Sequence, residues 1–378
     1  MKLILKVTPG TAAQPLDRLL GMTLGLDIWV ARSDHLVLRT DEARAERLRQ
    51  LGYGVEQLHL TRDYLERHFT AAAVADYHSP ESLNDDMSAL AAAHPDIAEL
   101  RTIGASVQNR PILALRLGLR RNSEHKVLFV GCHHAREWIS VEVPFRLARH
   151  LLDHAEEAEV ATWLSGGEIW IAPMVNPDGH AFTRGRSDPE NRLWRKNRRD
   201  NGDGTTGVDP NRNYDFQWGT LDIDTSSKTP GAETYIGPRA FSEPESKAVA
   251  DLVDAQKFRG VVTYHSYSQL ILHPWGYTRT PIANHADHER LAGLGRQMAK
   301  SVKSVHGRVY VPEQASKLYP TAGDTTDWAY GKHQIPAITI ELRPDSHDEG
   351  GFILPPDQIA PAFEENLPAA LDFIRAVF

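Results

Sequence analysis

Short apolar runs alternate with longer amphipathic segments along most of the chain after residue 79. Runs rich in β-branched and aromatic residues are typical of buried strands, and apolar residues that recur every three to four positions are typical of helices. The expected strands are residues 113–117, 127–130, 169–173, 261–264 and 337–340, and the expected helices are residues 79–93, 141–154, 243–255, 288–305 and 357–378. This alternation predicts an α/β domain with a large mixed, mostly parallel sheet flanked by helices.

The first 60 residues follow a different order. We expect strands at residues 2–7, 27–31, 36–39 and 55–60, and helices at residues 15–24 and 41–51. The order β-α-β-β-α-β predicts a small α+β (ferredoxin-like) unit ahead of the larger one. The charged and then alanine-rich segment 61–75 indicates a helical connector, in which Arg62 and Arg67 offer cleavage points. We therefore expect one domain at residues 1–72 and a second at residues 73–378.

Composition sets limits on partners and on stability. The chain has 42 basic and 50 acidic residues, and this net charge of −8 argues against a nucleic-acid partner. No apolar segment approaches the length of a membrane span. Cys132 is the only cysteine, so no intrachain disulfide can form, and its place at a strand end favours a small buried side chain over a nucleophile. Residues 1–7 lack the features of a signal peptide, so we expect a cytoplasmic protein, or a secreted one whose leader has been removed.

Two histidines and a glutamate follow the expected strand 127–130. His134 and Glu137 are three positions apart, a spacing that lets an imidazole nitrogen and a carboxylate oxygen converge on one ion. His133 cannot form the same pair, because Arg136 stands three positions after it. The pair alone is weak evidence, since 18 histidines and 50 acidic residues make such spacings common by chance.

Two other strand ends supply what this pair lacks. His265 follows the strand 261–264, and Glu341 follows the strand 337–340. Standing alone, His265 would be an ordinary buried histidine and Glu341 a solvated strand end. Ligands bind at the carboxyl ends of strands in open α/β sheets, so these residues are expected to meet there. Together they predict a catalytic zinc with two histidine ligands, one carboxylate ligand and a separate carboxylate as base.

The motifs that contain these residues resemble those of the zinc metallocarboxypeptidases of the carboxypeptidase A/B type, in the same order. The motifs are His-Ala-Arg-Glu-Trp (134–138), Asn-Arg-Leu-Trp-Arg-Lys (191–196), Asp-Pro-Asn-Arg-Asn (209–213), His-Ser-Tyr-Ser-Gln (265–269) and Glu-Leu-Arg (341–343). The resemblance runs from about Tyr77 to the C-terminus. A weaker resemblance relates residues 1 to about 72 to the N-terminal propeptide domain of the family. Two motifs lie in the segment 178–234, which is too long and polar for an ordinary connection.

The resemblance implies a zinc-dependent exopeptidase that hydrolyses the C-terminal peptide bond of peptides. It makes His134, Glu137 and His265 the ligands of one Zn²⁺ per chain. It makes Glu341 the general base and places Arg195 beside the oxyanion that develops on the attacked carbonyl. Whether the full chain is a zymogen stays open at this point.

The resemblance also implies how a free C-terminal carboxylate is recognised. Arg212 and Asn211 correspond to the family's carboxylate-binding pair, and a planar guanidinium beside an amide donor suits two oxygens. Tyr319 corresponds to a mobile tyrosine, and Arg136 to a further substrate-binding arginine. Pro320 departs from the family pattern, which usually has a more permissive residue at this position. A proline restricts the residue before it to extended conformations, so we expect it to limit the motion of Tyr319.

The side-chain pocket is expected to accept more than one kind of residue. Counting from Tyr319 places Thr326 at the position that separates the A type from the B type, and a threonine predicts neither specificity. Asp324 stands where the bacterial carboxypeptidase T has an acidic residue. The expected pocket walls are Leu272, Leu318, Thr339 and Gln314. A carboxylate at the rim of an apolar pocket pairs with a C-terminal arginine and stays hydrated beside Phe or Leu, so we expect a carboxypeptidase T-like, dual specificity.

Two alternatives use the same fold. A peptide-binding module without activity would have lost a ligand or the base, and none is lost. An amidohydrolase of modified amino acids or peptidoglycan stems would share the zinc chemistry but lack the terminal-carboxylate group. Asn211, Arg212 and Tyr319 therefore favour the exopeptidase. We expect peptides as its substrates, no nucleic-acid or membrane partner, and a monomer.

Overall fold

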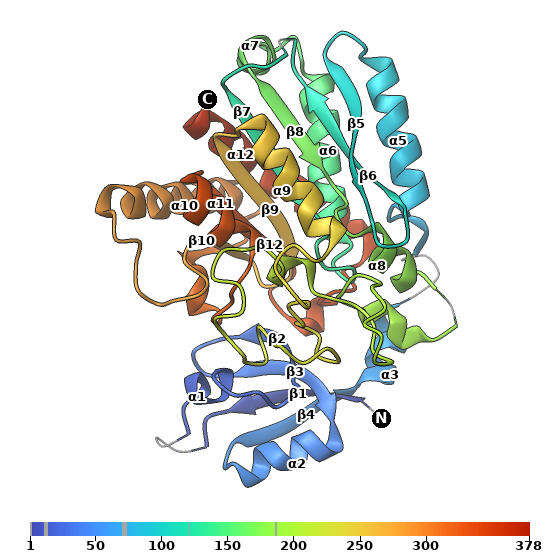
Figure 1. Ribbon diagram of the computed structural model, residues 1–378, viewed down its shortest axis with the longest axis vertical. Helices are drawn as coiled ribbons and strands as arrows, with labels where there is room; N and C mark the ends of the chain where they lie inside the picture. The colour runs from blue at the N-terminus through green and yellow to red at the C-terminus, as the bar shows by residue number, and fades with distance from the viewer. Residues whose placement is uncertain (1, 11–13, 70–73, 120, 186) are drawn as a thin grey trace.

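The structure, a computed structural model, describes residues 2–10, 14–69, 74–119, 121–185 and 187–378. A small unit formed by the N-terminal residues lies against a larger α/β unit (Figure 1). The strands of the small unit are β1 (Lys2–Thr8), β2 (Asp27–Ala31), β3 (Leu36–Asp41) and β4 (Gly54–Leu60), and its helices are α1 (Leu16–Leu20) and α2 (Glu42–Gln50). The four strands form an antiparallel sheet in the order β2-β3-β1-β4. The predicted element order is therefore present.

One predicted helix in the small unit is too long. Helix α1 ends at Leu20 rather than at Leu24, because Gly21 closes it and the residues that follow bond to the larger unit. The backbone N–H of Leu24 donates to a carboxylate oxygen of Asp224 at 2.8 Å. Tertiary hydrogen bonds thus replace the last turn of the predicted helix.

Both faces of the small sheet are apolar. Leu3 and Leu5 of β1 pack in a cluster with residues of α1 and α2. Ile4 points to the other face, where it packs in a cluster with Tyr267 and Phe352 of the larger unit. Because successive side chains of a strand alternate between faces, one strand serves both the small core and the contact between the units.

The larger unit is built on an eight-stranded mixed sheet. Its strands are β5 (Ala98–Ala105), β6 (Pro111–Leu117), β7 (Lys126–Gly131), β8 (Glu168–Ala172), β9 (Gly260–Ser266), β10 (Leu270–His273), β11 (Val311–Gln314) and β12 (Ala337–Leu342). They lie in the order β11-β10-β12-β9-β7-β8-β6-β5. The central strands β12, β9, β7 and β8 are parallel, and β5, β6 and β10 pair antiparallel with their neighbours toward the centre. A buried parallel centre explains the continuous apolar runs of the sequence.

Helices cover both faces of this sheet (Figure 1). One face packs against α5 (Pro80–Ala93), α6 (Ile139–Asp153), α7 (Ala158–Gly166), α10 (His285–His306) and α12 (Ile359–Val377). The other face packs against α9 (Pro244–Gln256) and α11 (Thr325–His333). Helix α3 (Thr61–His68) follows β4, and α8 (Pro177–Thr183) opens the long segment that carries two of the motifs. No helix among the described residues combines the length and the apolar character needed to cross a membrane.

The sequence predicts the central elements better than the peripheral ones. The five expected strands are present as β6, β7, β8, β9 and β12, and the five expected helices as α5, α6, α9, α10 and α12. The sequence does not predict β5, β10, β11, α7, α8 or α11. The predicted domain boundary after residue 72 lies outside the described residues.

Three parallel strands in the centre of the sheet place the predicted site at their carboxyl ends. Strand β7 leads into His134 and Glu137 through a turn at Cys132, which is fully buried, as predicted, and has φ of 56°. Glu341 in β12 lies opposite His265 in β9 in the parallel register. The backbone pairing of the sheet therefore brings the predicted residues together.

Candidate metal centre and substrate cavity

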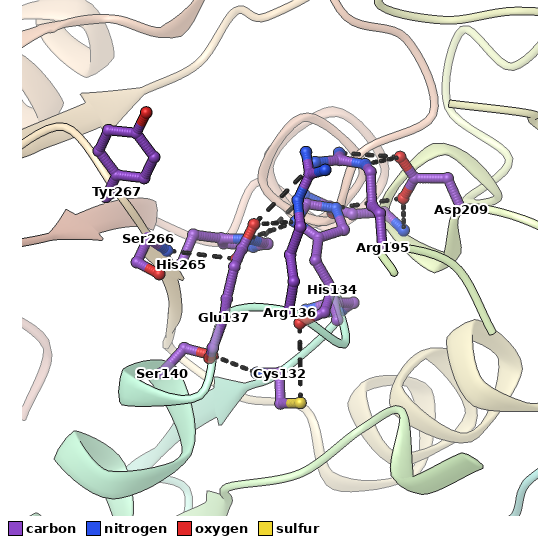
Figure 2. Close-up of polar contacts among 12 residues, drawn as sticks. Cys132, His134, Arg136, Glu137, Ser140, Arg195, Asp209, His265, Ser266 and Tyr267 are labelled. Atoms are coloured by element: carbon purple, nitrogen blue, oxygen red, sulfur yellow. Dashed lines mark hydrogen bonds and ion pairs between the residues drawn. The ribbon is translucent and has the colours of Figure 1, made fainter. Parts of the chain in front are cut away.

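Three side chains converge at the carboxyl edge of the large sheet. Glu137 Oε1 lies 2.8 Å from His134 Nδ1, and Glu137 Oε2 lies 3.0 Å from His265 Nδ1. The two Nδ1 atoms are 3.1 Å apart. All three side chains are buried, and their ligand atoms lie within 4.8 Å of one another. Figure 2 shows this group of three side chains, which we call the catalytic cluster after its predicted role, and its polar contacts.

The donor set of the catalytic cluster fits a zinc ion. Two imidazole nitrogens and one carboxylate oxygen form the ligand set of a catalytic zinc with one open position. If the Nδ1 atoms of His134 and His265 both carried a proton and donated to Glu137, two N–H donors would lie only 3.1 Å apart. A shared cation on their lone pairs removes this conflict. Burial alone would raise the pKa of Glu137, but His134 and His265 lower it well below its usual value, which keeps the carboxylate anionic.

Asp209 orients His134 from outside the catalytic cluster. Its Oδ1 lies 3.2 Å from His134 Nε2, and its Oδ2 accepts from Arg195 Nε and Nη2, both at 2.8 Å. Burial alone would raise the pKa of Asp209, but Arg195 and His134 hold it well below its usual value. A carboxylate on the outer nitrogen directs the inner nitrogen toward a metal. The sequence does not predict this role, although Asp209 opens the motif 209–213.

The other two histidines of this region have different surroundings. The outer nitrogen of His265, Nε2, lies 3.1 Å from the hydroxyl of Thr263. His133 is fully buried, and its Nε2 lies 2.9 Å from the hydroxyl of Tyr214. Its ring stacks on that of His265 at a centroid distance of 5.5 Å. His133 therefore packs behind the catalytic cluster and is not one of its ligands, as the sequence spacing predicts.

Glu341 lines the same cavity as the catalytic cluster but is not one of its three ligands. Burial raises the pKa of Glu341 well above its usual value, and the nearby Glu137 adds to the rise. A carboxylate in such an environment takes up a proton more readily than an exposed one. Its position on the cavity wall beside the catalytic cluster suits a proton acceptor.

The predicted carboxylate-binding residues line this cavity as well. Arg212 is held in place, since its Nε donates to the carbonyl oxygen of Thr225 and its Nη1 to that of Asn211, both at 2.7 Å. The Asn211 side-chain oxygen accepts from the backbone N–H of Thr325 at 2.9 Å, so its amide nitrogen is turned toward the catalytic cluster. Tyr319 also lines the cavity. Burial raises the pKa of the Tyr319 hydroxyl, and the nearby Arg195 and Arg212 oppose this rise.

Arg136 lines the cavity, but its guanidinium is paired with the small unit. Its Nη1 and Nη2 donate to the two carboxylate oxygens of Asp27 at 2.8 and 2.9 Å. The guanidinium carbon also lies 4.1 Å from the ring centroid of Phe352. Ile28 and Trp29, the next residues of β2, form part of the cavity wall. The sequence does not predict any of these three residues of β2 as part of the site.

The predicted side-chain pocket belongs to the same cavity. Its lining includes Leu272, Leu318, Asp324, Thr326 and Thr339. Asp324 is also the N-cap of α11, because its Oδ1 accepts from the backbone N–H of Asp327 at 2.8 Å and from the Thr326 hydroxyl at 3.0 Å. Gln314 lies outside the cavity lining, since its amide donates to the carbonyl oxygen of Thr278 at 2.7 Å. The expected polar wall at Gln314 is therefore wrong, because this side chain fixes a neighbouring loop.

Comparison with known proteins identifies relatives of the chain. Residues 83–369 match the family model of the zinc carboxypeptidases. Zinc carboxypeptidase A 1 of Anopheles gambiae is 36% identical over 308 residues, which cover 79% of this chain and 67% of that protein. Carboxypeptidase B of Astacus astacus is 34% identical over 299 residues, which cover 77% of this chain and 93% of that protein.

Two solved structures have the same fold over the full chain. The carboxypeptidase A from Helicoverpa armigera aligns with a TM-score of 0.86 and 24% identity, covering 100% of this chain and 97% of that chain. The thrombin-activatable fibrinolysis inhibitor aligns with a TM-score of 0.79 and 24% identity, covering 100% of this chain and 98% of that chain. At this identity the likeness concerns the fold alone.

The contacts of Asp209 generate a prediction about metal affinity. Asp209→Asn removes the negative charge that orients His134, so we expect the affinity for zinc to fall by about 10- to 100-fold. Competition with a chromogenic chelator measures this affinity. Asp200→Asn is the matched control, because Asp200 is an exposed acid of the same long segment that accepts from the backbone of Gly202. Unchanged zinc affinity in a correctly folded Asp209→Asn protein would contradict the proposed role.

Proposed function

The chain belongs to the zinc carboxypeptidase family and is a metallocarboxypeptidase that uses one Zn²⁺, and we propose that His134, Glu137 and His265 hold this ion. The main support for this proposal is that the ligand atoms of these three residues converge in one buried cluster. That cluster lies on the wall of a cavity that Glu341 also lines. The reaction is hydrolysis of the C-terminal peptide bond of a peptide substrate.

Glu341 is the general base of this reaction. Zinc, when bound, supplies Lewis-acid polarisation and activation of water. A carboxylate oxygen of Glu341 accepts a proton from the attacking water and later gives it to the leaving amine. Two observations support this role. Glu341 lies opposite His265 in the sheet register, and it is not part of the ligand cluster.

Arg195 stabilises the negative charge that develops on the attacked carbonyl oxygen. The pair with Asp209 holds its buried guanidinium in one position. Its Nη1 lies 4.0 Å from Glu137 Oε1, so the guanidinium is next to the catalytic cluster. A fixed positive group in a site shielded from water contributes strongly to transition-state stabilisation, because it needs no reorganisation during the reaction.

Arg212, Asn211 and Tyr319 recognise the free carboxylate at the end of the substrate. The backbone contacts of Arg212 leave its planar group on the cavity wall, where it can donate hydrogen bonds to two carboxylate oxygens. Arg136 binds the peptide on the other side of the scissile bond. Pro320 restricts the backbone of Tyr319 to extended conformations, which limits the motion of this residue.

We further propose that residues 1–72 form a ferredoxin-like propeptide domain and that the full chain is a zymogen. Asp27 occupies the guanidinium of Arg136, which makes this arginine unavailable to a substrate. Ile28 and Trp29 take up space in the same cavity. A peptide cannot bind there while β2 stays in place.

Contacts away from the cavity also hold the small unit in place. The carboxylate of Asp224 accepts from the backbone N–H groups of Leu24 and Gly25 at 2.8 and 2.7 Å. At the other end, the Tyr64 hydroxyl donates to the carbonyl oxygen of Gly350 at 2.6 Å. Arg62 and Arg67 on α3 are exposed, and they remain the proposed cleavage points for activation.

For the side-chain pocket we propose a carboxypeptidase T-like dual specificity. Leu272 and Leu318 offer apolar wall to Phe or Leu. Asp324 offers a carboxylate to the guanidinium of a C-terminal arginine. Although Asp324 caps α11, each carboxylate oxygen has two acceptor sites, so the group retains capacity for a further donor.

The first test of the function is digestion of peptides followed by mass spectrometry. We expect the trypsin-treated enzyme to shorten peptides from the C-terminus, and a zinc chelator to stop this. Glu341→Gln is expected to lower kcat by about 10²- to 10⁴-fold with zinc content unchanged, because it removes the base and no ligand. Glu313→Gln is the control, since Glu313 is a half-buried carboxylate of β11 outside this cavity. If Glu341→Gln also lost its zinc, the assignment as base would be wrong.

The pair between Asp27 and Arg136 predicts how the zymogen is held. Asp27→Asn leaves the buried guanidinium without its counter-charge, which costs about 3–5 kcal/mol, so the basal activity of the full chain should rise. Asp17→Asn should change little, because the Asp17 pair with Arg279 also joins the two units but is 59% and 52% exposed. After trypsin treatment all three proteins should have the same kcat/KM. Unchanged basal activity in Asp27→Asn would argue against the zymogen.

Asp324→Asn tests the specificity. Asparagine caps a helix as well as aspartate does, so the substitution removes the charge and keeps α11. We expect kcat/KM to fall about tenfold or more for a substrate that ends in Arg, because hydrogen bonds to charged groups are worth about 1.5–3 kcal/mol. The value for a matched substrate ending in Phe should stay the same. An equal effect on both substrates, or release of only one class by the wild type, would refute dual specificity.

A further inference from the structure

A second group of metal-binding side chains lies across the contact between the two units. His59 belongs to β4 of the small unit, and His347 and Asp348 belong to the 3₁₀ turn η4 (His347–Glu349) of the large unit. Within the described residues, only this group and the catalytic cluster bring three such ligand atoms within 4.8 Å of one another. One ligand comes from the small unit and two from the large unit, so an ion bound here would join them.

Two of the three separations between the ligand atoms match the edges of a tetrahedral site. Asp348 Oδ1 lies 3.3 Å from His347 Nε2 and 3.7 Å from His59 Nε2. With zinc–ligand distances of about 2.1 Å, the edges of a tetrahedral site are about 3.4 Å long. A charge-assisted hydrogen bond would be shorter, at about 2.7–2.9 Å. The two separations therefore suit ligands of one ion better than direct hydrogen bonds.

The side chains differ in exposure in a way that suits metal entry. The side chains of His59 and His347 are 16% and 11% exposed, whereas that of Asp348 is 72% exposed. The two imidazole rings meet at 64° with centroids 5.6 Å apart, so they do not stack on one another. An ion can enter from the side of Asp348 and find two imidazoles fixed in the interface.

Neighbouring contacts hold the two halves of this group in register. On the side of the small unit, His59 lies on β4, which is paired with β1. Tyr64, in the helix that follows β4, donates to the carbonyl oxygen of Gly350 at 2.6 Å. On the side of the large unit, Arg308 Nη1 pairs with Glu349 at 2.7 Å. The turn that carries two of the ligands is thus anchored on both sides. Binding of an ion therefore costs little conformational entropy.

We propose that His59, His347 and Asp348 bind a second Zn²⁺ ion, which clamps the small unit onto the large one. Two imidazoles and one carboxylate leave one position for water. Hard cations prefer all-oxygen sites, so Mg²⁺ and Ca²⁺ do not bind here. The inference does not depend on which residues hold the catalytic ion.

The test counts zinc in the full-length chain by mass spectrometry after equilibration with free zinc buffered in the micromolar range. We expect two ions per wild-type chain, one per chain in His134→Ala or His59→Ala, and none in the double variant. Asp348→Asn, on an exposed side chain, should weaken the second site at least tenfold without affecting the fold. His306→Ala is the matched control, since His306 pairs with Glu364 on the surface at 2.9 Å, and it should keep two ions.

Thermal unfolding adds a readout that is independent of activity. In the His134→Ala background, zinc should raise Tm by a few degrees, because it binds only the docked native chain, and Mg²⁺ should not. The rise should vanish when His59→Ala is added.

The outcomes separate this site from the catalytic one. One ion per wild-type chain, or two ions in a folded His59→Ala protein, would overturn the inference. If His134→Ala kept both ions while His59→Ala lost one, the catalytic ligand assignment would fail and the interfacial site would stand.

Discussion

The parallel alignment of β7, β9 and β12 is the constraint on which the catalytic cluster depends. Parallel neighbours end at the same edge of a sheet, and the register sets Gly131 beside Tyr264 and Glu341 beside His265. Backbone hydrogen bonds, rather than loops, therefore fix the distance between the proposed base and a proposed ligand. A slip of one residue in β12 would turn the Glu341 side chain to the opposite face of the sheet.

The same constraint explains which site residues could be predicted from the sequence. His265 and Glu341 each come directly after an apolar run. Both residues can therefore be recognised from the neighbouring sequence as polar side chains at the end of a strand. Asp27 gives no such signal. It is a single acid in a strand of the small unit, and its partner Arg136 is 109 positions away. Asp209 is intermediate, since it belongs to a motif but its two partners become apparent only in the folded chain.

Peripheral elements were harder to predict because tertiary contacts stabilise them. Strand β11 contains Pro312 and Glu313 and has no alternating apolar pattern, yet it pairs with β10 at the edge of the sheet, where a proline is tolerated. Strand β5 is partly exposed on the opposite edge. Helix α11 begins at the cap of Asp324 and buries polar residues such as Thr325 and Asp327, so no apolar stripe marks it.

The two arginines beside the catalytic cluster differ in where their acidic partners lie. This difference allows the large unit to hold Arg195 in position while the small unit covers the cavity. Arg195 has its buried partner, Asp209, in the large unit, so its position does not depend on the small unit. Arg136 has its partner, Asp27, in the small unit. In the proposed zymogen, release of the small unit therefore frees Arg136 and leaves Arg195 unchanged.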